Sequence, residues 1–282
     1  MTPQDYDYIR KILRERSGLV LSAEKQYLVE SRLLPVVRKA GLNNLGELVT
    51  ALKAVPSSAL ATTVVEAMTT NESFFFRDKL PFENFRDVLM PALLAARGQE
   101  RHIRIWCAAA ATGQEPYSLA MALKEMGTKV AGWNVEIFAT DISTATLEKA
   151  KSGLYSQFEV QRGLPIQMLV KYFAQVGDQW QIAPEIRNMV TYRHFNLLQD
   201  FAGFGMFDIV FCRNVLIYFD QDTKVGVLNR LCRSMRGDSY LMLGAAETVV
   251  GLTAAFKPLA AHRGVYVPNP ATVKVVQLAA AS

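Results

Sequence analysis

Residues 103–121, IRIWCAAAATGQEPYSLAM, decide the fold of this chain. The first five, IRIWC, form a short and mainly apolar run, which is typical of a strand buried in a parallel sheet. A loop that contains Gly113 follows, and the apolar spacing over residues 115–126 then predicts a helix. A buried strand, a short loop and a helix in this order are the beginning of a strand–helix–strand unit.

The same alternation continues further along the chain. Four more short apolar runs predict buried strands: VEIFAT (135–140), VTYRHF (190–195), FDIVFC (207–212) and SYLMLG (239–244). Helical patterns separate some of them, for example over residues 220–235. Strands that alternate with helices predict an α/β fold with an open, mostly parallel sheet covered on both faces. Such sheets bind ligands at the carboxyl ends of their strands.

The first 70 residues show a different pattern, because four helical segments follow one another and strand patterns are nearly absent. The first helix should end at Gly18. The second has Leu28 and Leu34 in its predicted apolar stripe, and Pro35 should kink or interrupt it. Apolar residues at helical spacing mark two more helices, around residues 45–52 and 60–68. This block predicts a small helical bundle whose apolar stripes pack against one another.

Two segments depart from the alternation of strands and helices. Residues 172–186, YFAQVGDQWQIAPEI, predict short antiparallel strands around residues 177–178, an excursion from the main sheet that is too small to be a domain. Residues 268–282 are polar and rich in alanine, and we expect this tail to be frayed.

Composition excludes several classes of protein. Of the 282 residues, 50% are hydrophobic and 20% are charged, which is typical of a globular protein. No run approaches the roughly 20 apolar residues of a membrane span, and the N-terminus carries acids where a signal peptide carries bases, so we expect a cytoplasmic protein without membrane insertion. The three cysteines have no CxxC spacing, which predicts neither a disulfide framework nor a metal site. A net charge of +5 permits an acidic partner but does not require nucleic acid.

Polar residues follow the predicted strands where ligands are expected. The loop after the first strand lacks the GxGxxG pattern, and Glu115 at its end is, on the residues alone, better explained as an acid favoured by the helix dipole. Asp141 follows the second strand, where it can accept hydrogen bonds from a ribose diol or cap a turn, and the sequence favours neither. Arg213 and Asn214 follow a buried strand and are poor core residues, although Arg213 could pair with a carboxylate and Tyr218 could simply pack.

The segment before the sheet is a second candidate lining of a ligand site. In TTNESFFFRD (69–78) the three phenylalanines are most simply explained as packing residues. Asn71 and Arg77 are harder to assign to a core, because polar turn residues beside aromatic side chains often line a pocket.

These motifs, taken in order, resemble those of the CheR-type chemotaxis receptor methyltransferases. The resemblance runs from about residue 5 to residue 267 and rests on TTNESFFFRD (69–78), IWCAAAATGQEPYSLAM (105–121), ATDIS (139–143), LEKAKSGLY (147–155), FNLL (195–198) and FDIVFCRNVLIYFD (207–220). Members of that family transfer a methyl group from S-adenosylmethionine to receptor glutamates and release S-adenosylhomocysteine. The resemblance therefore implies this activity for the chain.

The resemblance also implies a domain organisation. A small all-α helical bundle precedes a Rossmann-like S-adenosylmethionine-dependent methyltransferase domain, into which a small antiparallel β-subdomain is inserted. The implied parts are a helical receptor-recognition domain (1–70), a linker that contributes to the cofactor site (71–90), the methyltransferase domain (91–267) with its β-subdomain (about 172–189), and a flexible tail (268–282).

Carried over residue by residue, the family's cofactor contacts imply a set in this chain: Asn71, Ser73, Arg77, Glu115, Asp141, Asn196, Leu197, Arg213 and Asn214. Asp141 would bind the ribose, and Asn196 and Leu197 would lie on the adenine side. Arg77 and Tyr218 are the implied catalytic residues, nearest the reacting methyl group. No metal is implied.

The implied partner is the acidic cytoplasmic helical bundle of a methyl-accepting chemotaxis receptor. Arg32, Arg38 and Lys39 on the second predicted helix would steer docking, whereas the general alternative for such a charge run is a solvated basic face. The excursion at 172–186 lacks the extra segment of members that bind a receptor-tail pentapeptide, so we expect a peptide-independent enzyme. Nothing in the sequence requires a dimer, so we expect a monomer. LGAAE at 243–247 departs from the more usual Gly-His-Ser-Glu.

Two other functions compete with this one. A nucleic-acid methyltransferase would share the cofactor site, but it needs an Asn/Asp-Pro-Pro-Tyr loop for a flipped base where this chain has Arg213-Asn214-Val215-Leu216. A non-catalytic adaptor that binds the cofactor or its product as a signal would keep the pocket without turnover. The presence of Arg77 and Tyr218 argues against the adaptor.

Overall fold

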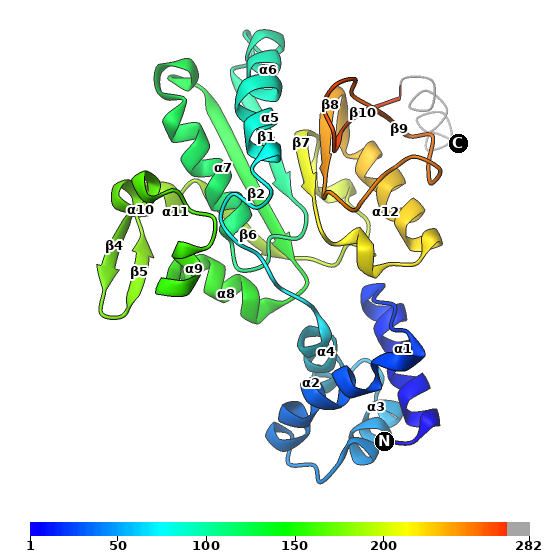
Figure 1. The fold of residues 1–282 in the computed structure, drawn as a ribbon. Coiled ribbons are helices and arrows are strands. Elements are labelled where there is room, and N and C mark those ends of the chain that lie inside the picture. Colours follow the sequence, from blue (N-terminus) through cyan, green and yellow to red (C-terminus); the bar gives the residue numbers. More distant parts are fainter. Residues whose placement is uncertain (270–282) are drawn as a thin grey trace.

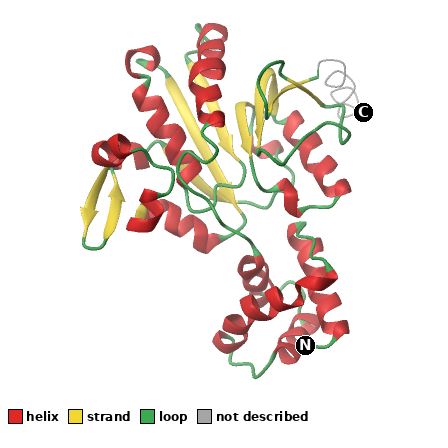
Figure 2. Ribbon diagram, viewed as in Figure 1, coloured by secondary structure: helices red, strands yellow, loops and turns green. Residues whose placement is uncertain are grey.

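The computed structural model describes residues 1–269 and consists of a helical domain and an α/β domain joined by an extended linker (Figure 1). Figure 2 shows that the part near the N-terminus contains helices only, whereas the other part carries the strands. The predicted fold class is confirmed by this arrangement. No helix within residues 1–269 combines the length and apolar character that crossing a membrane requires.

The helical domain consists of α1 (Pro3–Ser17), α2 (Gln26–Lys39), α3 (Leu45–Ala54) and α4 (Ala59–Met68), with a 3₁₀ turn η1 (Ala23–Lys25) before α2. The first helix ends at Gly18 as predicted, and Pro35 lies inside α2 without ending it. The predicted stripe of α2 is correct at Leu28, which packs against the core of the helical domain, and wrong at Leu34, which is 42% exposed. The two differ because positions six apart lie on different sides of a helix. The buried face, with helical spacing, is Val29, Leu33, Val36 and Val37.

The α/β domain is built on a seven-stranded sheet in the order β6-β2-β1-β7-β8-β10-β9. Its strands are β1 (His102–Cys107), β2 (Asn134–Asp141), β6 (Val190–His194), β7 (Phe207–Cys212), β8 (Met235–Leu243), β9 (Phe256–Pro258) and β10 (Val265–Pro268). The five predicted strands, β6, β2, β1, β7 and β8, pair in parallel as predicted. The expectation that all of them are buried is wrong for β6, because it is an edge strand on which Thr191, Arg193 and His194 are exposed. The antiparallel β10 and β9 were not predicted, because three or four residues are too few to show a period.

The sheet has two cores, since successive side chains of a strand point to opposite faces. Ile105 and Cys107 of β1 belong to the core under α7, α5, η2 and α6, whereas Trp106 belongs to the core under α12. The predicted covering of both faces is therefore present. The helices of this domain are α5 (Leu80–Asn84), the π-helix η2 (Phe85–Leu89), α6 (Met90–Ala96), α7 (Gln114–Glu125), η3 (Gly127–Val130), α8 (Thr144–Ser152), η4 (Ala202–Phe204), η5 (Leu216–Tyr218) and α12 (Gln221–Arg233).

A second, three-stranded sheet is inserted between α8 and β6, with antiparallel strands in the order β3-β5-β4 (Figure 1). The predicted hairpin is present, and Gly177 in its turn has φ 63°. The third strand was not predicted, because it is only three residues long and its partner is distant in the sequence. The elements of this insertion are β3 (Leu154–Ser156), α9 (Gln157–Gln161), α10 (Ile166–Tyr172), β4 (Phe173–Val176), β5 (Gln179–Ile182) and α11 (Pro184–Arg187).

Pro268 and Asn269, which the sequence analysis placed in the tail, belong to the folded domain. Pro268 ends β10, and the backbone N–H of Asn269 donates to the carbonyl of Ala255 at 2.8 Å. The remainder of the expected tail, residues 270–282, lies outside the described residues.

Candidate active site

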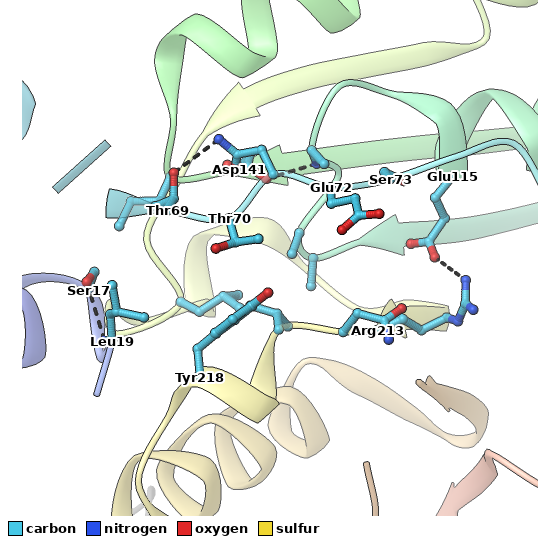
Figure 3. A pocket seen from close by; sticks show the side chains of 18 of the residues that line it. Ser17, Leu19, Thr69, Thr70, Glu72, Ser73, Glu115, Asp141, Arg213 and Tyr218 are labelled. Atoms are coloured by element: carbon cyan, nitrogen blue, oxygen red, sulfur yellow. Dashed lines mark hydrogen bonds and ion pairs between the residues drawn. The ribbon is translucent and has the colours of Figure 1, made fainter. Parts of the chain in front are cut away.

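The site is a pocket at the carboxyl ends of β1, β2 and β7, where the helical domain meets the α/β domain (Figure 3). All ten residues that the sequence analysis proposed for cofactor binding and catalysis line it: Asn71, Ser73, Arg77, Glu115, Asp141, Asn196, Leu197, Arg213, Asn214 and Tyr218. Twelve further residues of the described part of the chain line the pocket, and among them Ser17 and Leu19 of the helical domain were not singled out from the sequence. The pocket therefore combines strand ends, the linker and part of the helical domain.

Asp141 lies at the end of β2 with its carboxylate bound to backbone. It accepts hydrogen bonds from the N–H groups of Ala111 and Ser143, both at 2.9 Å. Burial raises the pKa of the Asp141 carboxyl, and these backbone hydrogen bonds oppose the shift. The cap of α8 is Ser143, whose hydroxyl accepts from the N–H of Thr146. Asp141 therefore does not cap this helix. Its bond to Ser143, two residues on, does cap the turn after β2, and its bond to Ala111 joins the loop after β1 to the end of β2.

Arg213 is the centre of a buried ion network at the end of β7. One terminal nitrogen donates to Oε2 of Glu115 at 2.7 Å, a contact visible in Figure 3. The other donates to Oδ2 of Asp78 at 2.7 Å and to the carbonyl oxygen of Arg77 at 3.0 Å. Burial raises the pKa of the Glu115 carboxyl, against the effect of the adjacent guanidinium. Nε of Arg213 is buried and has no partner among residues 1–269.

The linker turn before α5 has an unusual backbone. Phe76, Asp78 and Lys79 have φ values of 51°, 70° and 50°, in the left-handed region that residues other than glycine avoid. The turn is held by the N–H of Phe76, which donates to Oγ of Ser118 at 2.9 Å, and by the Arg213 contacts to its other residues. Such backbone persists only where its surroundings hold it firmly, and here they hold it beside the pocket.

The polar side chains of the linker are restrained to different degrees. The guanidinium of Arg77 donates to the carbonyl of Glu72 at 2.9 Å and lies 5.5 Å from the centre of the Phe74 ring. The Asn71 amide donates to the hydroxyl of Thr146 at 2.9 Å, which ties the linker to α8. The Arg77 guanidinium therefore keeps N–H donors available for a ligand. The Asn71 amide is already used in a contact that holds the linker against α8.

The helical domain closes the pocket with the segment between α1 and α2. Leu19 lines the pocket, and the N–H of Val20 donates to the carbonyl of Tyr218 at 2.9 Å. Gly18 has φ 76°, and a Cβ at this position would lie 2.9 Å from the Phe219 ring, so glycine permits the close approach. Tyr218 follows β7 in the sequence but packs against the core of the helical domain, and Figure 3 shows its side chain in the pocket.

Two family models together cover residues 4–69 and 71–265. The first describes the all-alpha domain of CheR methyltransferases and the second describes their SAM binding domain. The chain belongs to the CheR methyltransferase family. It is a SAM-dependent methyltransferase, and the resemblance seen in the sequence is confirmed.

Curated relatives of this CheR-family protein match over most of their length. Chemotaxis protein methyltransferase Cher2 of Pseudomonas putida is 41% identical over 88% of this chain and 91% of its own. Chemotaxis protein methyltransferase 1 of Pseudomonas aeruginosa is 43% identical with the same coverage, and the protein of that name in Vibrio cholerae is 39% identical over 94% and 96%. Among solved structures, the magnesium protoporphyrin IX methyltransferase of Synechocystis is only distantly similar, with TM-score 0.33 and 16% identity over 81% of this chain and 83% of that chain.

The lining of the pocket fits S-adenosylmethionine chemically. The loop after β1 presents alanine methyl groups at Ala108, Ala109 and Ala111, so a ligand can approach its backbone closely. The Asp141 carboxylate suits a ribose diol. The unpartnered Nε of Arg213 and the neighbouring carboxylates suit a group that carries both charges, such as an amino-acid end.

Asn196, which we expected at the adenine side of the cofactor, and Arg32, which we expected at the receptor interface, both donate hydrogen bonds to backbone carbonyls within the protein. The amide nitrogen of Asn196 donates to the carbonyl of Arg16 at 2.6 Å and so joins the two domains. The guanidinium of Arg32 turns inward and donates to the carbonyls of Met68 and Thr69 at 2.7 and 3.0 Å. Arg32 therefore supports the end of α4 and the start of the linker, while the other two candidate docking residues, Arg38 and Lys39, are exposed.

Proposed function

We propose that this CheR-family protein transfers the methyl group of S-adenosylmethionine to glutamate side chains in the cytoplasmic domains of chemotaxis receptors, giving glutamate methyl esters and S-adenosylhomocysteine. The observation that carries the proposal is the convergence of all ten candidate residues on one pocket. The names of the relatives, chemotaxis protein methyltransferases, support the choice of pathway. With such receptors as substrates, the protein acts in the cytoplasm, and we expect it to act as a monomer.

The chemistry needs alignment rather than proton transfer. A glutamate side chain has a pKa of about 4.3, so it is already a carboxylate nucleophile at neutral pH. Bound S-adenosylmethionine supplies an electrophilic methyl group on a sulfonium. The residues of the pocket then have to orient the incoming carboxylate and exclude water. The guanidinium of Arg77 would hold this carboxylate, and the hydroxyl of Tyr218 would orient it by a hydrogen bond.

The remaining pocket residues would hold the cofactor. We assign Asp141 to the ribose, and Asn196 and Leu197 to the adenine side. Arg213 and Glu115 lie together at the end of β7 and would bind the charged amino-acid end. The other assigned cofactor contacts come from the linker and from the loop after β7: Asn71, Ser73, Arg77 and Asn214.

The receptor would dock on the outer face of α2. Tyr27 and Leu34 are 69% and 42% exposed, and their spacing puts them on the same side of the helix as Arg38. Lys39 adds a second exposed cation at the end of this helix. A face that combines large apolar side chains with cations suits an acidic helical bundle.

Independence from a receptor-tail peptide belongs to the same proposal. The hairpin of the inserted sheet is compact, since Val176 of β4 pairs directly with Gln179 of β5. We expect that a pentapeptide from a receptor C-terminus will not bind in a calorimetric titration. A dissociation constant in the low-micromolar range, about −8 kcal/mol, would overturn this part of the proposal.

The test of the whole proposal uses S-adenosylmethionine labelled on its methyl group. The protein is incubated with receptor cytoplasmic fragments or with duplex DNA, and labelled receptor is then treated with mild alkali. We expect label on the receptor only, released as methanol by alkali, because carboxyl methyl esters hydrolyse under these conditions. Label on DNA would support the nucleic-acid methyltransferase, and binding of S-adenosylhomocysteine without transfer to either substrate would support the adaptor.

A further inference from the structure

Glu247 lies beyond the end of β8 and outside the pocket lining, but its carboxylate gathers four backbone donors. Oε2 accepts from the N–H groups of Gly244 and Asn214 at 2.7 and 2.8 Å. Oε1 accepts from the N–H groups of Val215 and Leu216 at 3.0 and 2.8 Å. The side chain is 9% exposed, and no lysine or arginine of the described residues forms an ion pair with it. Its charge is therefore satisfied by backbone alone.

Three of these donors belong to the loop that carries Tyr218. The loop leaves β7 at Arg213 and reaches Tyr218 in the 3₁₀ turn η5. Asn214 has φ 58°, and this left-handed residue turns consecutive N–H groups toward one point, which makes an anion-binding concavity. Glu247 fills this concavity. Without the carboxylate the buried N–H groups would lose their acceptor, and the loop could recover one only by moving.

The turn that carries Glu247 fits closely against the same loop. A Cβ on Gly244 would lie 2.8 Å from Nδ2 of Asn214 and 2.8 Å from Oε2 of Glu247, so only glycine fits there. The departure from the family pattern at LGAAE falls instead on Ala245 and Ala246, which are exposed. The two residues of the turn that make these contacts are unaffected by it.

We propose that Glu247 is a positioning residue for methyl transfer: it fixes the loop between β7 and η5 and thereby places Tyr218 in the pocket. The inference rests on the proposed function, in which Tyr218 is a catalytic residue. The loop is held from its other side by the hydrogen bond from Val20 to the carbonyl of Tyr218. Tyr218 is therefore fixed between the turn after β8 and the helical domain.

The test replaces Glu247 and measures turnover, ligand affinity and hydrogen exchange together. Glu247→Gln keeps the shape but replaces one acceptor oxygen with a donor that faces other donors. We expect kcat for receptor methylation to fall at least about tenfold. The affinity for S-adenosylhomocysteine should fall far less than kcat, because Asn214 is the one residue of the released loop segment 214–216 among the nine assigned cofactor contacts. Amide exchange at residues 214–216 should accelerate at least about tenfold. Glu247→Asp keeps the charge on a shorter side chain and should lie between the wild type and Glu247→Gln.

Asp208→Asn is the matched control. Asp208 is 1% exposed, accepts from the N–H of Arg104 at 2.8 Å and from Nε of Arg97 at 2.9 Å, and lies at the opposite end of β7 from the pocket. The Asp208→Asn substitution should lower the Tm but leave kcat and the amide exchange at residues 214–216 unchanged. The proposal fails if Glu247→Gln keeps kcat within about twofold of the wild type, or if the control lowers kcat equally at the same loss of Tm.

Hydrogen exchange separates this inference from the proposed function, since it needs no turnover. A wild-type protein that binds S-adenosylhomocysteine but does not methylate receptor fragments contradicts the proposed function. Unaccelerated exchange at residues 214–216 in Glu247→Gln contradicts the role of Glu247.

Discussion

The two walls of the pocket differ in how they are held. The sheet wall consists of Asp141, Glu115 and Arg213, all of them buried. Each is bonded to backbone or to an opposite charge within this wall. Breaking a buried ion pair on one side leaves the other charge uncompensated, so this wall is rigid and costly to disturb.

The helical wall, formed by Ser17, Leu19 and the segment up to Val20, is held by fewer and more exposed contacts. Its contacts with the α/β domain include the backbone hydrogen bond from Val20 to Tyr218 and the ion pair of Arg14 with Asp220. The Arg14 side chain of this ion pair is 63% exposed. Exposed pairs of this kind contribute little to stability. The two walls therefore differ in what it costs to disturb them.

The largest effect is expected from breaking the sheet wall. Arg213→Ala leaves the buried Glu115 carboxylate unpaired, so the free energy of unfolding should fall by about 3–5 kcal/mol. The affinity for S-adenosylhomocysteine should fall at least about 100-fold in calorimetry. Arg86→Ala, which breaks an exposed pair with Asp87, is the control and should cost less than about 1 kcal/mol. Unchanged affinity in a folded Arg213→Ala protein would show that Arg213 does not bind the cofactor.

The second largest effect is expected on turnover, from substitutions of the two proposed catalytic residues, Arg77 and Tyr218. Arg77→Ala and Tyr218→Phe should lower kcat roughly 100-fold at saturating S-adenosylmethionine, because they remove groups that orient the reacting carboxylate. Their affinity for S-adenosylhomocysteine should fall far less than kcat, and Arg77→Ala should lower it more than Tyr218→Phe does, because Arg77 is also assigned to the cofactor. Labelled-methyl transfer and calorimetry measure the two quantities. Normal turnover in either variant would remove that residue from the catalytic assignment.

A pH series sharpens the description of the sheet wall. Burial raises the pKa values of Asp141 and Glu115, so both should take up protons, and ligand affinity should fall, at a pH where ordinary carboxyls remain ionised. In this range the folded protein binds more protons than the unfolded chain, which favours folding, so these two groups do not lower the Tm there. Calorimetry between about pH 7 and 5, beside thermal unfolding, checks both statements.

Asp141→Asn is the matched variant for this series. At neutral pH it should weaken binding of S-adenosylhomocysteine about tenfold, since a charged acceptor becomes a neutral amide. Its affinity should then depend less on pH than that of the wild type. Equal pH dependence in both proteins would assign the effect to another group.

The smallest effect is expected from substitutions on the outer face of α2, where we propose that the receptor docks. Arg38→Glu with Lys39→Glu should lower kcat/KM for receptor fragments about fivefold at low salt, and the difference should shrink as salt rises. Binding of S-adenosylhomocysteine should not change, because neither residue lines the pocket. Lys257→Glu with Arg263→Glu makes the same charge change on other exposed residues. An equal loss in this control would indicate net charge rather than the α2 face.

The parts of the fold that could be predicted are those whose signal is local. Strands β1, β2, β7 and β8 were found because each contains an apolar run, and a parallel sheet buries such runs. The edge strand β6 is largely exposed, and it was found because it continues the alternation of strands and helices. The ten pocket residues were found because the motifs that carry them could be compared in order along the chain. The alternatives left open at Asp141 and Arg213 needed the structure, since a cap, an ion pair and a ligand contact use the same residue types.

The parts that were missed depend on contacts between distant segments. Leu19 enters the pocket only because Gly18 lets the chain pass close to Phe219. The exposure of Leu34 depends on which face of α2 the other helices cover, and periodicity alone does not choose between neighbouring faces. The three-residue strand β3 is stabilised by its partner β5 rather than by its own pattern.

The sequence by itself determined the four N-terminal helices, five strands of the main sheet, the family and the set of residues offered to the cofactor, because apolar periodicity and side-chain chemistry can be seen residue by residue. Only the tertiary structure decided that Arg32 supports the linker from inside, that Asn196 joins the two domains and that Glu247 holds the loop of Tyr218. In all three cases the partner is a backbone N–H or carbonyl. Since nearly every residue carries these groups, no sequence pattern marks which of them a folded chain will bring into reach.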